Sequence, residues 1–255
     1  MKYGKQSQIG LLGTKNEDSC LIADEAPRRG DKRSSGIIFT VADGLGGHLA
    51  GEIASQMACE WVVSEYYKDE SPFTQEGDKG ETRIFRLERI VWMAHRLILS
   101  RSREEEGLRG MGTTLSALVL RDHEALIAHV GDSRIYRLRD GLCQRMTVDH
   151  TGSQFLLDAG RLPPEGENGD PCGRIVTQAL GGYDNLSQVF TRTEELRQDD
   201  IMLLCTDGLH DYLTDQDICR ILQENDSPQR ACDELVRTAL TKGGQDDITA
   251  IVIHA

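Results

Sequence analysis

The sequence predicts an α+β protein in which two mainly antiparallel β-sheets carry helices on their outer faces. One observation is a series of apolar, β-branched runs between residues 112 and 146, which are connected by short links. Strands joined by such short links pair in the antiparallel direction. A second observation is that amphipathic helical patterns occur in two pairs, one before these strands and one after, and that a final strand closes the chain. Helices in this arrangement are expected to cover the outer faces of two sheets.

The chain before residue 112 is expected to form strands followed by two helices. An apolar run at 37–42 has the length and composition of a buried strand, and the polar stretch 27–35 before it is expected to be a hairpin loop. Apolar residues then recur with a helical period at 51–68 and at 82–103, separated by the polar segment 69–81. Two helices with a modest loop between them favour an antiparallel pair in one layer.

Residues 112–146 are expected to form two hairpins. The first joins strands at 113–120 and 124–130 through a short turn, Arg121-Asp-His. The second joins strands at 134–138 and 142–146 through Arg139-Asp-Gly141, and an Asp-Gly pair between two apolar runs is the stronger hairpin signal.

Residues 150–182 interrupt the regular pattern. A short helical piece at 154–159 leads into GRLPPEGENGDPCGR, which is rich in glycine, proline and acidic residues. Because it has no apolar periodicity, this stretch predicts a mobile, flap-like excursion at the surface rather than part of the core.

The C-terminal part returns to regular structure. Its expected elements are two strands, two helices and a last strand, at 189–193, 201–206, 215–223, 228–242 and 248–253. The second helix has Ser227 as its N-cap, Pro228 at its first position and Gly243 beyond its end, which are the residue types that begin and end helices.

Length and composition predict one domain, 1–255, of a globular protein. No linker, low-complexity tract or internal repeat divides the 255 residues, of which 38% are hydrophobic and 28% charged. The net charge of −13 argues against a nucleic acid as partner, because phosphate backbones are bound by clustered lysine and arginine. No apolar run reaches the length of a membrane span, and the first ten residues lack the apolar core of a signal peptide.

The cysteines predict a reducing, cytoplasmic environment. The seven cysteines form no CxxC pair, and several lie in apolar strand or helix patterns. Reduced core residues are therefore expected in preference to disulfides or zinc ligands.

Acidic residues stand at the ends of five predicted strands. They are Glu17 and Asp18, Asp43, Asp132, Asp207, and Asp246 with Asp247. Carboxylates brought together by converging strand ends would repel one another unless something neutralises them. A hard divalent cation is the simple way to stabilise such a cluster, so we infer a metal site.

Six short motifs occur in one order along almost the whole chain. They are Asn16-Glu-Asp18, Val41-Ala-Asp-Gly-Leu-Gly-Gly-His48, Gly112-Thr-Thr114, Gly131-Asp-Ser-Arg134, Thr206-Asp-Gly208 and Gly244-Gln-Asp-Asp-Ile-Thr249. Together they resemble the metal-dependent type 2C serine/threonine protein phosphatases, in particular the compact bacterial members. The resemblance implies a four-layer αββα sandwich with the active site at one edge between the two sheets.

The resemblance also implies a role for each acidic residue. Asp43 is expected to bridge two metal ions, and the carbonyl of Gly44 to bind one of them. Asp207 and Asp246 are expected to ligate the other ion, while Glu17 and Asp18 act mainly through metal-bound water. Asp132 matches the residue that, with Asp207, holds a third, weaker ion in bacterial relatives. Ligands that are all oxygen suit Mg²⁺ or Mn²⁺ and disfavour zinc.

The implied activity is hydrolysis of phosphoserine and phosphothreonine in proteins by a metal-bridged water or hydroxide. The implied partners are phosphorylated proteins and an opposing Ser/Thr kinase with its targets, and we expect a monomer. His48, in the glycine-rich loop, is a candidate general acid, although such a histidine more often packs or caps a helix.

Two positions depart from the family pattern. Where an arginine usually grips the substrate phosphate, three residues before Asn-Glu-Asp, this chain has Gly13. Lys15 is the candidate substitute, but a lysine cannot form the two-pronged contact of an arginine. Asp247 stands where asparagine is frequent and adds negative charge. Gly13 motivates an alternative function, a weakly active or non-catalytic module that binds phosphoproteins.

The remaining polar residues have plain structural interpretations. His150 is expected to order the start of the excursion, and His210 to shape the loop after Asp207. Arg134 and Arg137 alternate with apolar residues, which is also the pattern of a solvated strand face.

Overall fold

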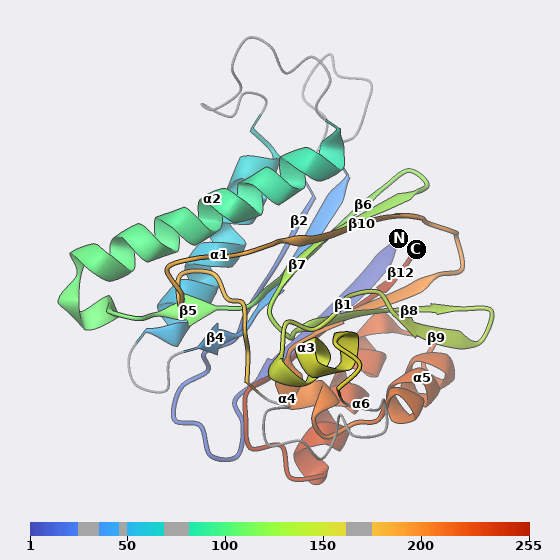
Figure 1. Ribbon diagram of the computed structural model, residues 1–255. Helices are drawn as coiled ribbons and strands as arrows, with labels where there is room; N and C mark the ends of the chain where they lie inside the picture. Colours follow the sequence, from blue (N-terminus) through green and yellow to red (C-terminus); the bar gives the residue numbers. More distant parts are fainter. Residues whose placement is uncertain (25–35, 46–49, 69–81, 162–174) are drawn as a thin grey trace.

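The computed structural model describes residues 1–24, 36–45, 50–68, 82–161 and 175–255 (Figure 1). The predicted hairpin loop at 27–35, His48, the segment 69–81 and the centre of the predicted excursion lie outside these ranges. Within them the chain forms two five-stranded sheets and one two-stranded sheet, and every strand pair is antiparallel.

Sheet A and sheet B are the two large sheets. Sheet A has the order β1 (Lys2–Gln8), β12 (Ile248–His254), β11 (Ile201–Cys205), β8 (Arg134–Arg139) and β9 (Leu142–Arg145). Sheet B has the order β10 (Phe190–Glu195), β7 (Glu124–Val130), β6 (Leu115–Arg121), β3 (Ile37–Ala42) and β2 (Ser19–Asp24). The small sheet pairs β4 (Gly44–Leu45) with β5 (Gly112–Thr113).

The longer helices lie on the outer faces of the two large sheets, as Figure 1 shows. Helices α1 (Gly51–Tyr66) and α2 (Arg83–Glu104) pack on sheet B, and α5 (Asp215–Glu224) and α6 (Pro228–Thr241) pack on sheet A. Three shorter helices complete the described chain: η1 (Glu106–Leu108), α3 (Gly152–Asp158) and α4 (Asp207–His210). The predicted αββα sandwich and its helix pairs are therefore confirmed.

The sandwich has three hydrophobic layers, which explains why its strands are apolar at almost every position. In β3, Ile38 and Ala42 face the helices, while Phe39 and Val41 face sheet A. Alternate side chains of a strand point to opposite faces, and here both faces are covered by protein. Leu204 and Ile251 of sheet A complete the layer between the sheets.

Both predicted hairpins form, and their turns have the backbone conformation that tight hairpins require. Asp140 and Gly141 have φ of 50° and 76° between β8 and β9, and Asp122 has φ of 51° between β6 and β7. Positive φ at these positions matches the twist of the flanking strands. The strand predicted at 113–120 is divided into β5 and β6, with a break at Thr114.

The interpretation of Arg134 and Arg137 as a solvated strand face is wrong. Only 16% of the Arg134 side chain is exposed, and it forms a two-pronged ion pair with buried Asp149. Arg137 is 12% exposed and contacts Glu194 of β10, so it joins sheet A to sheet B. Buried guanidinium groups need such partners, because an unpaired charge in the interior is costly.

Candidate functional site

The antiparallel pairing brings the acidic strand ends of each sheet together. In sheet B, the start of β2 lies beside the end of β3, where Ser19 pairs with Ala42. In sheet A, the end of β11 lies beside the start of β12, where Cys205 pairs with Ala250. The same ends of the two sheets meet, since the Thr206 hydroxyl donates a 2.8 Å hydrogen bond to Asp18 Oδ2. The acids therefore converge at one end of the sandwich.

The backbone of Asp43 is held on both sides by the Thr113-Thr114 pair. The Asp43 N–H donates to Thr114 Oγ1 at 2.9 Å. Its carbonyl oxygen accepts from Thr113 Oγ1 at 2.8 Å and from the Thr114 N–H at 2.9 Å. Thr114 Oγ1 is also 2.7 Å from the hydroxyl of Ser133, the neighbour of Asp132. One threonine thus connects the loops that carry Asp43 and Asp132.

Two glycines allow Glu17 to pack against Gly44, the residue after Asp43, and against the start of α1. A Cβ on Gly44 would collide with the backbone of Gly51, and a Cβ on Gly51 would collide with the Glu17 carboxylate. The Glu17 carbonyl oxygen is held by the Ser55 hydroxyl of α1 at 2.6 Å. The first turn of α1 is therefore packed against the loop that precedes β2.

The backbone around Asp132 is fixed by two buried histidines. His150 Nδ1 accepts the Gly131 N–H at 3.1 Å, and the His150 N–H donates to the Gly131 carbonyl at 2.7 Å. His210 Nε2 lies 3.0 Å from the carbonyl oxygen of Asp132 and must donate to it, because a carbonyl only accepts. Both histidines therefore order backbone, as expected, but His210 holds the loop of Asp132 and not its own segment after Asp207, which forms α4.

Asp247 joins the two ends of the chain at this site. Its carboxylate accepts the N–H of Gly10 at 3.0 Å and the N–H of Glu17 at 2.6 Å. An asparagine has only one acceptor oxygen, so the aspartate can accept two backbone donors with its two oxygens. An aspartate in place of the more frequent asparagine therefore lets position 247 hold the backbone of both Gly10 and Glu17.

The carboxylates perturb one another. Burial raises the pKa of Asp43 well above its ordinary value, and the charges of Asp207, Asp18 and Asp132 raise it further. Burial is also the first cause that raises the pKa of Asp18 and of Asp132, and the charge of Asp207 adds to both. The pKa of Asp207 itself rises to about 6, again mainly through burial. Without a cation these carboxyl groups therefore resist ionisation, because they are buried and crowded together.

Among the described residues, two carboxylate oxygens of the cluster have no partner. Asp18 Oδ1 and Asp207 Oδ1 are buried and accept no hydrogen bond from this part of the chain. A buried charged oxygen is ordinarily paired or bound to a metal ion. Within the described ranges, no three Asp, Glu, His or Cys side chains form a group that could hold an ion as they stand. The carboxylate oxygens are ligands of the right chemistry for a hard cation, but the side chains would need to move closer together to bind one.

The other predicted site residues lie around this cluster or outside the described chain. Asp207 is the first residue of α4, and the carboxylate of Asp246, just before β12, accepts the N–H of Asp247 at 2.9 Å. Lys15, with 63% of its side chain exposed, forms an ion pair with Glu52 in the first turn of α1. His48 lies outside the described residues.

Sequence reasoning assigned no role to Thr114, Thr206 or Glu52. Thr206 directly precedes Asp207, and a hydroxyl beside an acidic motif is a signal for a hydrogen bond that orients a carboxylate, whereas Thr114 lies far from any acidic motif in the sequence. Glu52 gave no signal, because its contact with Lys15 joins residues far apart in the sequence.

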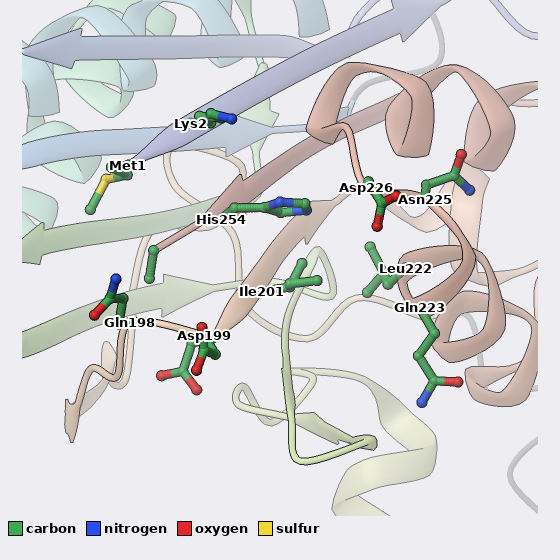
Figure 2. A pocket seen from close by; sticks show the side chains of 12 residues that line it. Met1, Lys2, Gln198, Asp199, Ile201, Leu222, Gln223, Asn225, Asp226 and His254 are labelled. Carbon is green, nitrogen blue, oxygen red and sulfur yellow. The ribbon is translucent and has the colours of Figure 1, made fainter.

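A separate cavity of about 460 Å³ lies at the opposite end of sheet A (Figure 2). It is lined by His254, the last residue of β12, whereas Asp246 and Asp247 precede the first residue of that strand. Ile201, Leu222 and Asp226 also line it. The cavity is therefore distinct from the acidic cluster.

The fold and the cluster define an αββα protein with a carboxylate-rich site between the ends of two sheets. Residues 13–250 match the protein phosphatase 2C family. The chain is 33% identical over 252 residues to the serine/threonine protein phosphatase PstP of Mycobacterium tuberculosis, which covers 99% of this chain and 44% of PstP. It is 34% identical over 226 residues to the protein phosphatase PhpP of Streptococcus pneumoniae, with 87% of each protein covered.

Structural similarity agrees with these relatives. A crystal structure of the PstP catalytic domain in complex with two manganese ions has a TM-score of 0.78 and 31% identity, covering 98% of this chain and 96% of that chain. The chain belongs to the protein phosphatase 2C family. It spans less than half the length of PstP. In the described ranges no helix is both long and apolar enough to cross a membrane.

Proposed function

We propose that this chain hydrolyses phosphoserine and phosphothreonine in proteins and needs divalent metal ions to do so. The observation that carries the proposal is the convergence of Asp18, Asp43, Asp132 and Asp207. Their carboxylates raise one another's pKa, and two of their buried oxygens have no partner among the residues that the structure describes. The names of the relatives PstP and PhpP support the activity, and the two manganese ions bound to PstP support the metal.

The proposed ligands are those of the carboxylate end of the sandwich. Asp43 would bridge two ions, with the Gly44 carbonyl on one side and Asp207 and Asp246 on the other. Glu17 and Asp18 would act through bound water. Asp132, with Asp207, would hold a third ion of lower affinity. Mn²⁺ and Mg²⁺ both suit these oxygen ligands.

Ions held there would activate a water molecule and neutralise the charge of the phosphate. The protein's own contribution is to hold the backbone of the ligand residues in place before an ion binds. Thr114 orients Asp43, His210 and His150 fix the backbone around Asp132, and Asp247 fixes the backbone of Glu17. Such outer contacts commonly change metal affinity by about 10–100-fold.

At the position of Gly13 this chain has no arginine that could bind the phosphate of the substrate. Lys15 is the proposed substitute, and its ion pair with Glu52 places it beside the first turn of α1, close to Glu17.

The role of His48 as a general acid stays a prediction, as do the single domain, the flap-like excursion at 150–182, the monomeric state and the cytoplasmic location. An opposing Ser/Thr kinase and its targets are the proposed partners.

The decisive experiment compares turnover with and without metal. Protein stripped with a chelator should be inactive on p-nitrophenyl phosphate and on a phosphothreonine peptide, and Mn²⁺ or Mg²⁺ should restore both activities. Asp233→Asn, an exposed acid on α6, should behave like the wild type. If the metal-loaded wild type binds the phosphopeptide and does not hydrolyse it, the alternative of a phosphoprotein-binding module is correct.

A further inference from the structure

Two cysteines, Cys143 of β9 and Cys219 of α5, lie side by side on the outer face of sheet A. The neighbouring Cys219 raises the pKa of the Cys143 thiol, and both side chains pack against the core cluster beneath α5 and α6. Both residues are partly exposed. The pair is formed by elements far from each other in the sequence, so spacing alone could not have predicted it.

Further contacts hold the helix against the hairpin that carries Cys143. Cys219 Sγ is 3.9 Å from the carbonyl oxygen of Gly141, the turn residue just before β9. Gln223, one helical turn later, donates to the same carbonyl oxygen at 2.9 Å. Helix α5 is thus fastened at Cys219 and at Gln223 to the turn that precedes Cys143, which keeps the two cysteines close together.

The other described cysteines differ from this pair. Cys59, Cys205 and Cys232 are buried in apolar surroundings, and burial raises the pKa of Cys59 and of Cys232 to about 12. Buried cysteines of this kind are shielded from oxidants in solution, whereas Cys143 and Cys219 are partly exposed. Cys20 is partly exposed, and burial raises the pKa of its thiol. Cys172 lies outside the described residues.

We propose that Cys143 and Cys219 are a redox pair that forms a reversible intramolecular disulfide when the protein meets a hydroperoxide. The site lies on the outer face of sheet A and does not depend on the proposed phosphatase activity. The sequence predicted reduced cysteines, and the six described cysteines are free thiols in this structure; the proposal concerns what two of them do on exposure to an oxidant.

The chemistry needs one equivalent of hydroperoxide. The thiolate of Cys219 attacks the terminal peroxide oxygen, the O–O bond breaks, and Cys219 becomes a sulfenic acid while the alcohol or water leaves. Cys143 sulfur then attacks the Cys219 sulfur, and the sulfenic oxygen leaves as water. The two thiols lose two electrons, which the peroxide gains. Burial, and then the neighbouring Cys219, raise the pKa of Cys143 to about 12, which favours Cys143 as the second thiol to react.

The disulfide would fasten an edge strand to a helix. Strand β9 pairs with β8 and lies at the end of sheet A. A bond between residues 143 and 219 closes a long loop, which restricts the unfolded chain and should raise the melting temperature. A dithiol reductant should reverse the rise.

The test oxidises the full-length, folded protein with hydrogen peroxide, blocks free thiols with an alkylating agent, and maps the peptides without reduction. A peptide pair linked through Cys143 and Cys219 should appear and disappear again on reduction. Cys219→Ser and Cys143→Ser should each abolish it, whereas Cys20→Ser, the matched partly exposed cysteine, should leave it unchanged. The oxidised wild type should melt at a higher temperature than the reduced protein, and Cys219→Ser should not.

Two outcomes would overturn the proposal. One is that the oxidised wild type carries sulfinic or sulfonic acids on these cysteines, or links to Cys172, without the 143–219 link. The other is that the link forms equally well in protein unfolded with urea, since the folded contact would then not be its cause. The wild-type map alone decides both, so the proposal can be tested even where a serine variant fails to fold.

Discussion

The hydroxyl of Thr114 accepts the backbone N–H of Asp43 at 2.9 Å and contacts the hydroxyl of Ser133 at 2.7 Å. Thr114 and Ser133 are both fully buried. The loop that carries Asp43 and the loop that carries Asp132 are therefore positioned by one side chain, which itself binds no metal in the proposed site.

Thr114→Val should weaken metal binding without removing a ligand. Valine keeps the shape of threonine but leaves the Asp43 N–H without its acceptor, which costs about 1–3 kcal/mol when the donor is buried. We expect a loss of Mn²⁺ affinity on the order of tenfold, measured by calorimetric titration. Thr114→Ser, which keeps the hydroxyl, is the control. Equal Mn²⁺ affinity in the valine variant would show that this contact does not orient Asp43.

Asp43→Ala should abolish phosphatase activity. In the proposed site Asp43 is shared by two ions, so its loss removes a ligand from both. We expect less than a tenth of wild-type turnover on p-nitrophenyl phosphate at saturating Mn²⁺, with Asp233→Asn as the matched control. Turnover above that level in a folded variant would be inconsistent with a two-metal site.

The metal-free protein should become less stable as the pH rises from about 4 to about 7. The pKa of Asp207 is raised from 3.8 to about 6, so across that interval the folded state holds more protons than the unfolded state. Stability therefore falls as the pH rises through this interval, and the raised pKa values of Asp43, Asp18 and Asp132 act in the same direction. Thermal melting with and without Mn²⁺ measures the effect.

Added Mn²⁺ should raise the melting temperature more at pH 7 than at pH 5, because protons compete with the ion for the carboxylates. The same metal-induced rise at both pH values would contradict the proposal that these carboxylates are the ligands.

Gly13→Arg should lower the Michaelis constant for a phosphopeptide if a guanidinium can reach the phosphate. A charge-assisted contact of this kind contributes on the order of 1.5–3 kcal/mol, which corresponds to tenfold or more in affinity. A Cβ at this position would lie 2.9 Å from Ile9 Cγ1 and 3.2 Å from Asp247 Oδ1, so some crowding is expected. Gly13→Ala measures that crowding separately by its melting temperature.

Lys15→Ala distinguishes the competing account. If Lys15 already binds the phosphate, its loss should raise the Michaelis constant, and Glu52→Gln, which releases Lys15 from its ion pair, should lower it. Unchanged Michaelis constants in Lys15→Ala and Gly13→Arg, in proteins that melt normally, would place phosphate binding away from this turn.

Much of the fold was predictable because its signals are local. The apolar run of β3, the Asp-Gly turn between β8 and β9 and the Ser-Pro start of α6 each depend on neighbouring residues, and each occurs where expected. The acidic residues at strand ends were also visible, since an acid directly after a buried strand stands out from its surroundings. Antiparallel pairing then brings such ends together.

Other features depended on contacts between distant parts of the chain. Arg134 and Arg137 have the same alternation in sequence as exposed residues, and only the approach of Asp149 and Glu194 makes them largely covered ion pairs. Asp247 holds the backbone of Gly10 and Glu17, and Cys143 lies beside Cys219. These residues are so far apart in the sequence that no pattern of spacing indicates their contacts. The sequence by itself determined which strands and helices form and which acids end them. The tertiary structure decided which charges are paired, which carboxylate oxygens stay unpaired and which thiols meet, because these depend on distances set only when the two sheets pack.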